Sequence, residues 1–257
     1  MSIHQTAIIH PKANLDSSVE IGPYAIIGEQ VSIGARTKIG SHSVIDGITQ
    51  VGEDCNLSPF CSIGQPPQDF KYKGEPTRVI VGNNNVFREY VTIHRGTPTG
   101  RNETVIGDHN YFMAYSHVAH DCLIGNHVIM ANAAALGGHI TIGDYAVLGG
   151  LVAVHQFVRI GGYAMIGGGA IVVQDVPPYL IASGNRAELH GLNLIGLKRN
   201  GFSKEEIDAI KKTYKLVFHA HRTLKEAVKE SRSTWGHLPR VETFLAFIEK
   251  SKRGICR

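Results

Sequence analysis

Large apolar residues recur at every sixth position over most of this 257-residue chain. The first positions are Ile9, Leu15, Ile21, Ile27, Ile33, Ile39, Ile45, Val51, Leu57 and Ile63, followed by Val81, Phe87 and Ile93. A run of twelve completes the pattern: Ile106, Phe112, Val118, Ile124, Met130, Leu136, Ile142, Leu148, Val154, Ile160, Ile166 and Val172. Since 43% of the residues are apolar, twelve in register would arise by chance about 4 times in 100,000. An amphipathic helix repeats near 3.6 and a strand at 2, so neither explains this period.

A second column of small or β-branched residues lies four positions after the first. Its members are Ala13, Val19, Ala25, Val31, Thr37, Ser43, Thr49, Cys55, Cys61, Ser116, Cys122, Val128, Ala134, Ala146, Val152, Val158, Ala164 and Ala170. A six-residue period is typical of a parallel β-helix, in which three units form one triangular coil of 18 residues. We expect both columns to point inward over about nine coils. Glycine often follows the large apolar residue, as at Gly22 and Gly34, and we expect it to supply the turn backbone that other residues resist.

Two segments interrupt the repeat. Residues 65–78 place Asp69 and Glu75 where apolar residues belong, and residues 96–103 add one residue to the spacing between Ile93 and Ile106. We predict that both loop out of the prism. Long excursions from a compact scaffold are commonly functional.

Helical signals replace the repeat after Pro178. Capping boxes start at Ser203 and Thr223, and apolar residues between 207 and 218 follow helical spacing. A last helix is predicted over residues 239–252, with Gly254 as its stop signal. The chain is therefore predicted to be an all-β solenoid followed by a small α-helical C-terminal domain.

The predicted β-helix and the predicted helical domain also differ in net charge. Residues 1–184, the predicted β-helix, carry 10 basic and 14 acidic side chains, whereas residues 185–257 carry 16 basic and 8 acidic ones. The helical domain thus has a net charge of +8, which either faces an acidic partner or is simply solvated.

Composition indicates a cytoplasmic protein. The N-terminus lacks the charged and apolar regions of a secretory signal, and no apolar run approaches the length of a membrane span. Cys55, Cys61 and Cys122 fall in the inward column, so packing explains them and disulfides are not expected. Neither a membrane nor a nucleic-acid partner is expected.

Four of the 14 histidines are predicted to cluster on successive coils: His117, His120, His139 and His155. The apolar residues next to them are 18 positions apart, and none of the four occupies an inward column. Such imidazoles can be merely solvated, can bind zinc, or can include a general base, because a neutral imidazole accepts a proton at physiological pH. Asp121 follows His120 and could orient its ring. The inward position of Cys122 argues against a thiol nucleophile.

At these residues the chain resembles the UDP-N-acetylglucosamine acyltransferases, which perform the first step of lipid A synthesis. The resemblance covers essentially the whole chain. The stretches that carry it are Gln68–Arg78 (QDFKYKGEPTR), Val91–Thr97 (VTIHRGT), His117–Cys122 (HVAHDC), Ala153–Phe157 (AVHQF), Gln174–Tyr179 (QDVPPY) and Gly196–Arg199 (GLKR).

The resemblance implies a left-handed parallel β-helix, an exception to the usual right-handed crossover. It also implies a homotrimer with active sites in the clefts between neighbouring prisms. The reaction would move an (R)-3-hydroxyacyl chain from acyl carrier protein to the 3-hydroxyl of UDP-N-acetylglucosamine by direct transfer, without a cofactor or a metal. The basic domain would then attract the acidic carrier protein.

The resemblance also assigns roles by position. His120 matches the general base, Asp121 the residue that supports it, and Gly138 the backbone N–H that stabilises the oxyanion. The matches for substrate binding are Asp69, Lys71, His117 and His139 for the sugar and phosphates, His155 and Gln156 beside the nucleotide and sugar, and Asn193 and Arg199 for uridine diphosphate.

Four further positions bear on specificity. Ile195 stands where well-known members have an acidic residue and Asn200 where they have Arg, so nucleotide contacts there are expected to differ. Gly168 matches the position that limits acyl length. A glycine leaves room, so we expect a longer hydroxyacyl chain, with Met165 lining the groove.

Other functions remain open from the residues alone. The related N-acyltransferases carry an additional N-terminal uridine-binding domain, and the repeat already begins at Ile9, so we expect no such domain here. An acetyl-coenzyme A-dependent transferase, a zinc enzyme of the carbonic anhydrase type and a non-enzymatic scaffold are further alternatives. The residues do not determine the length of the acyl chain. They also do not determine whether the acceptor carries a 3-hydroxyl or a 3-amino group.

Overall fold

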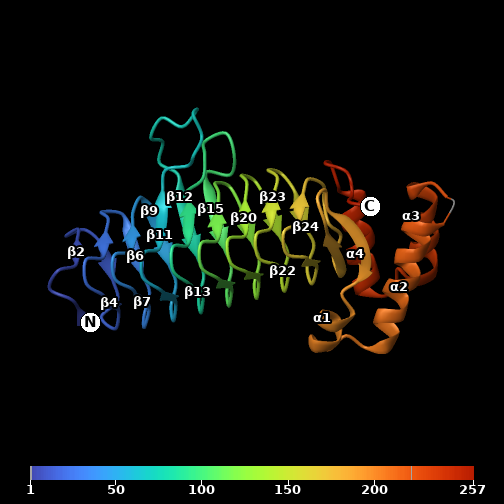
Figure 1. Cartoon of the computed structure of the whole chain (residues 1–257), viewed down its shortest axis with the longest axis horizontal. Coiled ribbons are helices and arrows are strands. Elements are labelled where there is room, and N and C mark those ends of the chain that lie inside the picture. The colour runs from blue at the N-terminus through green and yellow to red at the C-terminus, as the bar shows by residue number, and fades with distance from the viewer. Residues whose placement is uncertain (1, 221) are drawn as a thin grey trace.

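A long prism of short strands carries helices at its C-terminal end in the computed structural model, which describes residues 2–220 and 222–257 (Figure 1). Three sheets run along the prism, here called A, B and C. Sheet A contains β1 (Ser2–Ile3), β4 (Glu20–Ile21), β7 (Lys38–Ile39), β10 (Asn56–Leu57), β13 (Val86–Phe87), β16 (Tyr111–Phe112), β19 (Ile129–Met130), β22 (Val147–Leu148), β25 (Met165–Ile166), β27 (Leu180–Ser183) and β28 (Glu188–Leu192).

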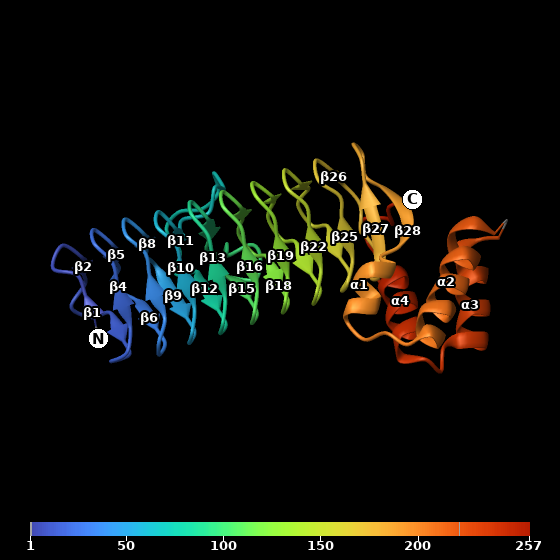
Figure 2. The same cartoon turned by 60° about the horizontal axis from the view of Figure 1, so that its bottom comes forward.

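The other two sheets close the triangle. Sheet B contains β2 (Ile8–Ile9), β5 (Ile26–Ile27), β8 (Val44–Ile45), β11 (Ser62–Gln65), β14 (Thr92–His94), β17 (His117–Val118), β20 (Ala135–Leu136), β23 (Ala153–Val154) and β26 (Ile171–Val172). Sheet C contains β3 (Asn14–Leu15), β6 (Val31–Ile33), β9 (Ile48–Val51), β12 (Arg78–Val81), β15 (Glu103–Ile106), β18 (Leu123–Ile124), β21 (Thr141–Ile142) and β24 (Arg159–Ile160). The chain passes from A to B to C in each coil from β1 to β24, as the stacked coils of Figure 2 show, and after β25 and β26 it returns to sheet A at β27.

Strand pairing follows the predicted 18-residue coil. Val118 pairs with Leu136, and Leu136 pairs with Val154, in parallel register. Both predicted columns are buried from Val19 to Val172, and only the first coil, which has no coil beneath it, leaves Ile9 and Leu15 partly exposed. Removing this apolar surface from water is the main stabilising contribution to the fold.

The expected role of the repeat glycines is wrong. Left-handed backbone falls three residues after the large apolar position, mostly on other residues, as at Asp121 (φ 61°) and His139 (φ 63°). Gly22 and Gly34 do not adopt positive φ. They are needed because of close approach: a Cβ on Gly34 would lie 2.8 Å from the carbonyl carbon of Gly52 in the next coil.

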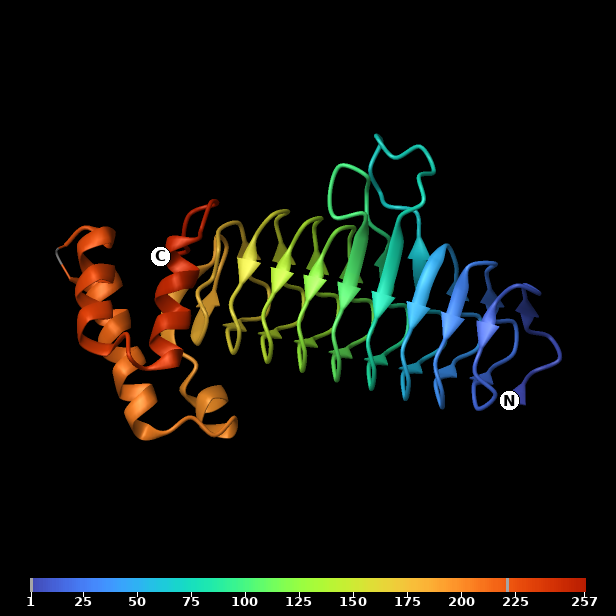
Figure 3. The ribbon, with the colours of Figure 1, turned by 180° about the vertical axis from the view of Figure 1, so that it is seen from behind.

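Both predicted loops leave the prism at one edge, which we call the BC corner because the chain there passes from sheet B to sheet C. The first loop joins β11 to β12 and the second joins β14 to β15, and both project from the same side (Figures 1 and 3). Gln65, Arg78 and Glu103, predicted to belong to the loops, are strand ends.

The C-terminal region contains α1 (Leu194–Arg199), α2 (Lys204–His219), α3 (Leu224–Trp235) and α4 (Pro239–Glu249). Capping boxes at Ser203 and Thr223 are present as predicted. The last helix ends at Glu249, earlier than predicted, and α1 was not predicted. Helices α2, α3 and α4 pack around a second apolar core (Figure 2). The predicted domain boundary after residue 184 falls between β27 and β28 and stays a prediction.

The segment after α4 returns to the prism. The Asp175 N–H donates to the Gly254 carbonyl at 2.9 Å, and the Cys256 N–H donates to the Asp175 carbonyl at 2.9 Å. No helix in the described residues combines the length and apolarity that crossing a membrane requires.

Candidate active site

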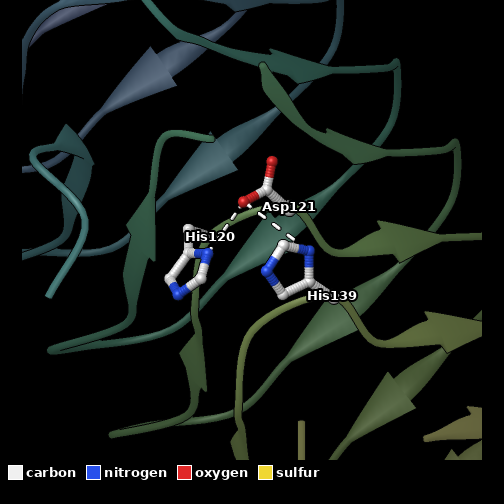
Figure 4. A group of neighbouring side chains, drawn as sticks. All are labelled: His120, Asp121 and His139. Atoms are coloured by element: carbon white, nitrogen blue, oxygen red, sulfur yellow. Dashed lines mark hydrogen bonds and ion pairs between the residues drawn. The ribbon is translucent and has the colours of Figure 1, made fainter. Parts of the chain in front are cut away.

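His120 and Asp121 occupy the BC corner between β17 and β18. The left-handed backbone of Asp121 turns its carboxylate back toward the preceding ring, and His120 Nδ1 lies 2.8 Å from Asp121 Oδ2 (Figure 4). The His120 side chain is 14% exposed and that of Asp121 is fully buried. The pair therefore lies outside the apolar core, as predicted, yet largely shielded from solvent.

The second loop provides that shield and binds the Asp121 carboxylate. The Thr97 hydroxyl donates to Oδ2 at 2.6 Å, the Thr97 N–H reaches both oxygens at 3.1 Å, and the Arg101 N–H donates to Oδ1 at 2.7 Å. Burial alone would raise the pKa of this carboxyl. Hydrogen bonds from His120, Thr97 and Arg101 outweigh burial and lower the Asp121 pKa to about 2.

The Asp121 carboxylate fixes the state of the His120 ring. A carboxylate can only accept, so neutral His120 carries its proton on Nδ1 and presents the lone pair of Nε2. Nε2 has no hydrogen-bond partner within residues 2–220 and 222–257. This is the arrangement of a general base.

Gly138 lies one coil further on, against the same ring. A Cβ at this position would lie 2.7 Å from His120 Nε2, so only glycine leaves the ring where it is. In the described part of the chain the Gly138 N–H donates to no acceptor. A free N–H beside a base is the geometry needed to stabilise a developing oxyanion.

Further imidazoles surround the pair. The His139 ring meets that of His120 edge-on at 5.0 Å between centroids, and stacks on Phe157 at 4.4 Å. His117 Nδ1 lies 2.7 Å from the Thr92 hydroxyl. Burial lowers the pKa of both His117 and His139, so both rings are neutral near pH 7 and can donate or accept.

A metal is the competing interpretation of this cluster. The potential ligand atoms of His120, Asp121 and His139 lie within 4.8 Å of one another, and such groups can bind zinc. However, the Asp121 oxygens already accept from Thr97, Arg101 and His120. A cation would have to displace these donors, so the site suits a hydrogen-bonded acid–base pair better.

The remaining predicted residues divide between two regions. Asp69 and Lys71 are in the first loop, and His155 and Gln156 follow β23, so these four share the BC corner with the pair. The Lys71 N–H donates to Asp69 Oδ1 at 2.9 Å. The negative charge of Asp69 also acts on the pKa of His139, which indicates that the loop reaches the site.

Four predicted residues are not brought to this corner. Met165 is in β25 of sheet A, and Gly168 is at the corner between sheets A and B. Asn193 caps α1, where its Oδ1 accepts from the Gly196 N–H at 3.1 Å, and Arg199 ends that helix. Helix α1 lies on the opposite side of the prism from the loops (Figures 1 and 3).

Two residues of the site were not predicted from the sequence. Thr97 is 1% exposed and binds the Asp121 carboxylate; it lies in the stretch 91–97 that carries the family resemblance, but nothing in the repeat indicates its partner. His94 is 7% exposed, meets His117 edge-on at 4.9 Å, and has an Nδ1 without a hydrogen-bond partner among the described residues. Its place at the end of β14, one coil before His117, was the available signal. Burial, and then the nearby His117 and His120, lower the His94 pKa to about 4.

Comparisons with known proteins find relatives that are similar along the whole chain. A family model described as Udp N-acetylglucosamine O-acyltransferase, domain 2, matches residues 175–256, and a bacterial transferase hexapeptide model of six repeats matches residues 12–47 and 103–138. The acyl-[acyl-carrier-protein]–UDP-N-acetylglucosamine O-acyltransferase of Trichlorobacter lovleyi is 60% identical over 260 residues, which cover 100% of both chains. Its counterpart in Thermodesulfovibrio yellowstonii is 58% identical over 255 residues, or 99% of both.

The chain belongs to the UDP-N-acetylglucosamine O-acyltransferase family. Solved structures of LpxA from Acinetobacter baumannii (TM-score 0.97, 44% identity, 99% of both chains) and Moraxella catarrhalis (TM-score 0.98, 43%, 100% of both) are similar throughout. The predicted family, the left-handed parallel β-helix with its helical C-terminal region, and the prediction of an acyltransferase are therefore confirmed. For a member of this family, the His120–Asp121 pair is the candidate catalytic centre.

Proposed function

We propose that this acyltransferase moves an (R)-3-hydroxyacyl chain from acyl carrier protein to the 3-hydroxyl of UDP-N-acetylglucosamine, the first step of lipid A synthesis. One observation carries the proposal: in a member of this family, a buried carboxylate holds His120 with a free Nε2 beside the free N–H of Gly138. A base and an oxyanion donor are the two groups that direct acyl transfer requires.

His120 and Gly138 act together in the proposed reaction. Nε2 of His120 removes the proton of the sugar hydroxyl while its oxygen attacks the thioester carbonyl carbon. The carbonyl oxygen becomes an oxyanion that accepts from the Gly138 N–H, and the C–S bond then breaks. The proton on Nε2 passes to the departing thiolate, and Asp121 stabilises the imidazolium between the two steps.

Substrate binding would use the polar groups around the pair. We assign Asp69, Lys71, His117 and His139 to the sugar and phosphates, following the family resemblance. His155 and Gln156 are assigned beside the nucleotide and sugar, and Asn193 with Arg199 to uridine diphosphate. Ile195 is 66% exposed, so it supplies apolar contact where other members have an acid, and the nucleotide contacts would differ accordingly.

A homotrimer accounts for the separation between these groups. Met165, Gly168 and α1 do not share the BC corner, so a neighbouring copy would bring them to it. The corner between sheets A and B also carries an exposed ladder of stacked rings: Tyr24, His42, Phe60, Tyr90 and Tyr115. Exposed apolar surface of this extent supports an interface. Sedimentation of the purified protein tests the assembly, and a monomeric active enzyme would contradict it.

Gly168 supports a longer acyl chain. A Cβ there would meet only the Gly150 backbone, at 3.3 Å, which leaves space for additional methylenes along the corner with Met165. We therefore expect fourteen-carbon hydroxyacyl donors to be preferred over ten-carbon donors. Preference for the shorter donor would contradict this assignment.

The basic C-terminal domain would attract the acidic carrier protein. Some of its arginines are occupied within the domain: Arg232 pairs with Glu242 and Glu249, and Arg222 pairs with Glu230. Exposed lysines are left for the partner. Added salt should then raise the KM of the carrier-protein donor more than that of the sugar nucleotide; equal sensitivity would count against steering.

Mass spectrometry of the products tests the reaction itself. Purified enzyme would receive UDP-N-acetylglucosamine or its 3-amino analogue, with hydroxyacyl carrier proteins of mixed length or acetyl-coenzyme A. We expect an O-linked hydroxyacyl product. Exclusive use of the amine or of coenzyme A would overturn the proposal, as would activity that follows zinc content. A cytoplasmic location stays a prediction.

A further inference from the structure

A cavity of about 550 Å³ lies where the segment after α4 meets the BC corner. Its lining residues are Phe157, Arg159, Asp175, Lys250, Lys252 and Arg253. Four of these six side chains are cationic and one is acidic. The prism contributes Arg159, whereas the C-terminal segment contributes the other three cations.

The cations in this cavity lack acidic partners. Within the described residues, none of the four forms an ion pair with a carboxylate. The Arg159 guanidinium lies over the Phe247 ring at 4.3 Å, and Arg253 donates to the Val173 carbonyl at 2.8 Å and to His155 Nδ1 at 2.7 Å.

The acid in the lining does not neutralise them. The Asp175 carboxylate accepts from the Arg159 backbone N–H at 2.8 Å and from the Ser251 hydroxyl at 2.8 Å. Since like charges around a concave surface repel one another and focus a positive potential, the cavity favours an anion.

The cavity adjoins the candidate catalytic centre. Phe157 lines it and stacks on His139, whose ring in turn meets that of His120. Arg253 also holds His155, a residue assigned to substrate. An anion bound here would therefore be part of a molecule that extends toward His120.

We propose that this cavity binds a phosphate group of a substrate. The inference rests on the proposed function, in which both substrates carry phosphate: the donor on its 4′-phosphopantetheine arm and the acceptor as a diphosphate. Lys250 and Lys252 contact the phosphate oxygens, and Arg159 and Arg253 frame the site.

The test compares equilibrium binding of two matched pairs by calorimetry, so it does not depend on turnover. One pair is a non-hydrolysable hydroxyacyl thioether of 4′-phosphopantetheine and the same thioether of pantetheine; the other is UDP and uridine. The variant is Lys250→Gln with Lys252→Gln. Lys225→Gln with Lys229→Gln, two exposed positions on α3, is the charge-matched control.

We expect the cavity variant to bind one phosphate-bearing compound about tenfold more weakly than the wild type does. Its affinity for the phosphate-free counterpart should be unchanged. The affected pair identifies the donor or the acceptor as the source. If both phosphate compounds bind the cavity variant as they bind the control, or if phosphate adds no affinity in the wild type, the inference is wrong. Failure of the wild type to form the O-acyl product would instead contradict the proposed function, while these affinities remain measurable.

Discussion

Gly138 lies directly against the imidazole of His120, so that a Cβ at position 138 would lie 2.5 Å from Cε1 of that ring. The 18-residue coil creates this contact, since Gly138 follows His120 by one coil. One glycine thus serves two purposes: it leaves room for the His120 ring, and it offers an N–H that has no partner in the described residues.

Gly138→Ala should lower kcat by about 100-fold, because the displaced ring loses both its bond to Asp121 and its alignment with the hydroxyl. The melting temperature should change little, since the ring can move toward solvent. The control is the double variant of His120→Ala with Gly138→Ala: no ring remains to be displaced, so its kcat should match that of His120→Ala alone. Wild-type kinetics for Gly138→Ala would show that residue 138 does not position the His120 ring.

His120→Ala should lower kcat by about 10²- to 10⁴-fold, the range for loss of a general base, with an unchanged circular dichroism spectrum. His109→Ala provides the comparison, because His109 stacks on His127 at the corner between sheets C and A. Its activity should match the wild type. A loss of less than tenfold in His120→Ala would remove this residue as the base.

Thr97 should act as a positioning residue for the pair. Thr97→Val keeps the shape of the side chain but removes the donor to Asp121, leaving a buried carboxylate oxygen with one bond fewer, at a cost of about 1–3 kcal/mol of stability. We expect kcat to fall about tenfold with KM for the sugar nucleotide unchanged, and Thr97→Ser to restore it. A change in KM alone would place Thr97 in substrate binding instead.

The repeat made the fold and much of the candidate site predictable. A six-residue period fixes which side chains face inward, so Cys122 was correctly placed in the core and His120 outside it. Stacking at 18 residues then brings His120, Gly138 and Gln156 to one corner. These inferences need only the sequence, because each coil contacts its neighbours in a fixed register.

Other features could not be predicted because they depend on segments outside the repeat or on how closely neighbouring coils approach each other. Thr97 reaches Asp121 from an extruded loop whose path no period describes. The prediction that the repeat glycines supply turn backbone was wrong, because close approach between coils, rather than a positive φ, excludes a side chain at Gly34. Helix α1 is too short for a periodic signal, so the positions of Asn193 at its N-cap and Arg199 at its end, away from the BC corner, could not be predicted.

The buried histidine His94 should make stability depend on pH. Its pKa of about 4 in the folded state is below its ordinary value of 6.5, so as pH falls the unfolded chain takes up the proton first. Stability is then lost between about pH 6.5 and pH 4, by about 3 kcal/mol for this group. Burial lowers the pKa of His117 and His139 as well, which adds loss in the same direction.

Asp121 should act in a separate, more acidic window. Its pKa of about 2 is below the ordinary 3.8. Its contribution to the stability of the fold is therefore complete above pH 3.8 and disappears as pH falls toward 2. The free energy of unfolding in urea, measured as a function of pH, tests both groups. For His94→Gln it should fall less steeply between pH 6.5 and pH 4 than in the wild type, and for Asp121→Asn it should no longer fall below pH 3.8. His109→Gln, at an exposed position, should change neither. A proton NMR titration that places His94 near 6.5 would contradict this account, because it would mean that the ring reaches solvent or a partner for its Nδ1.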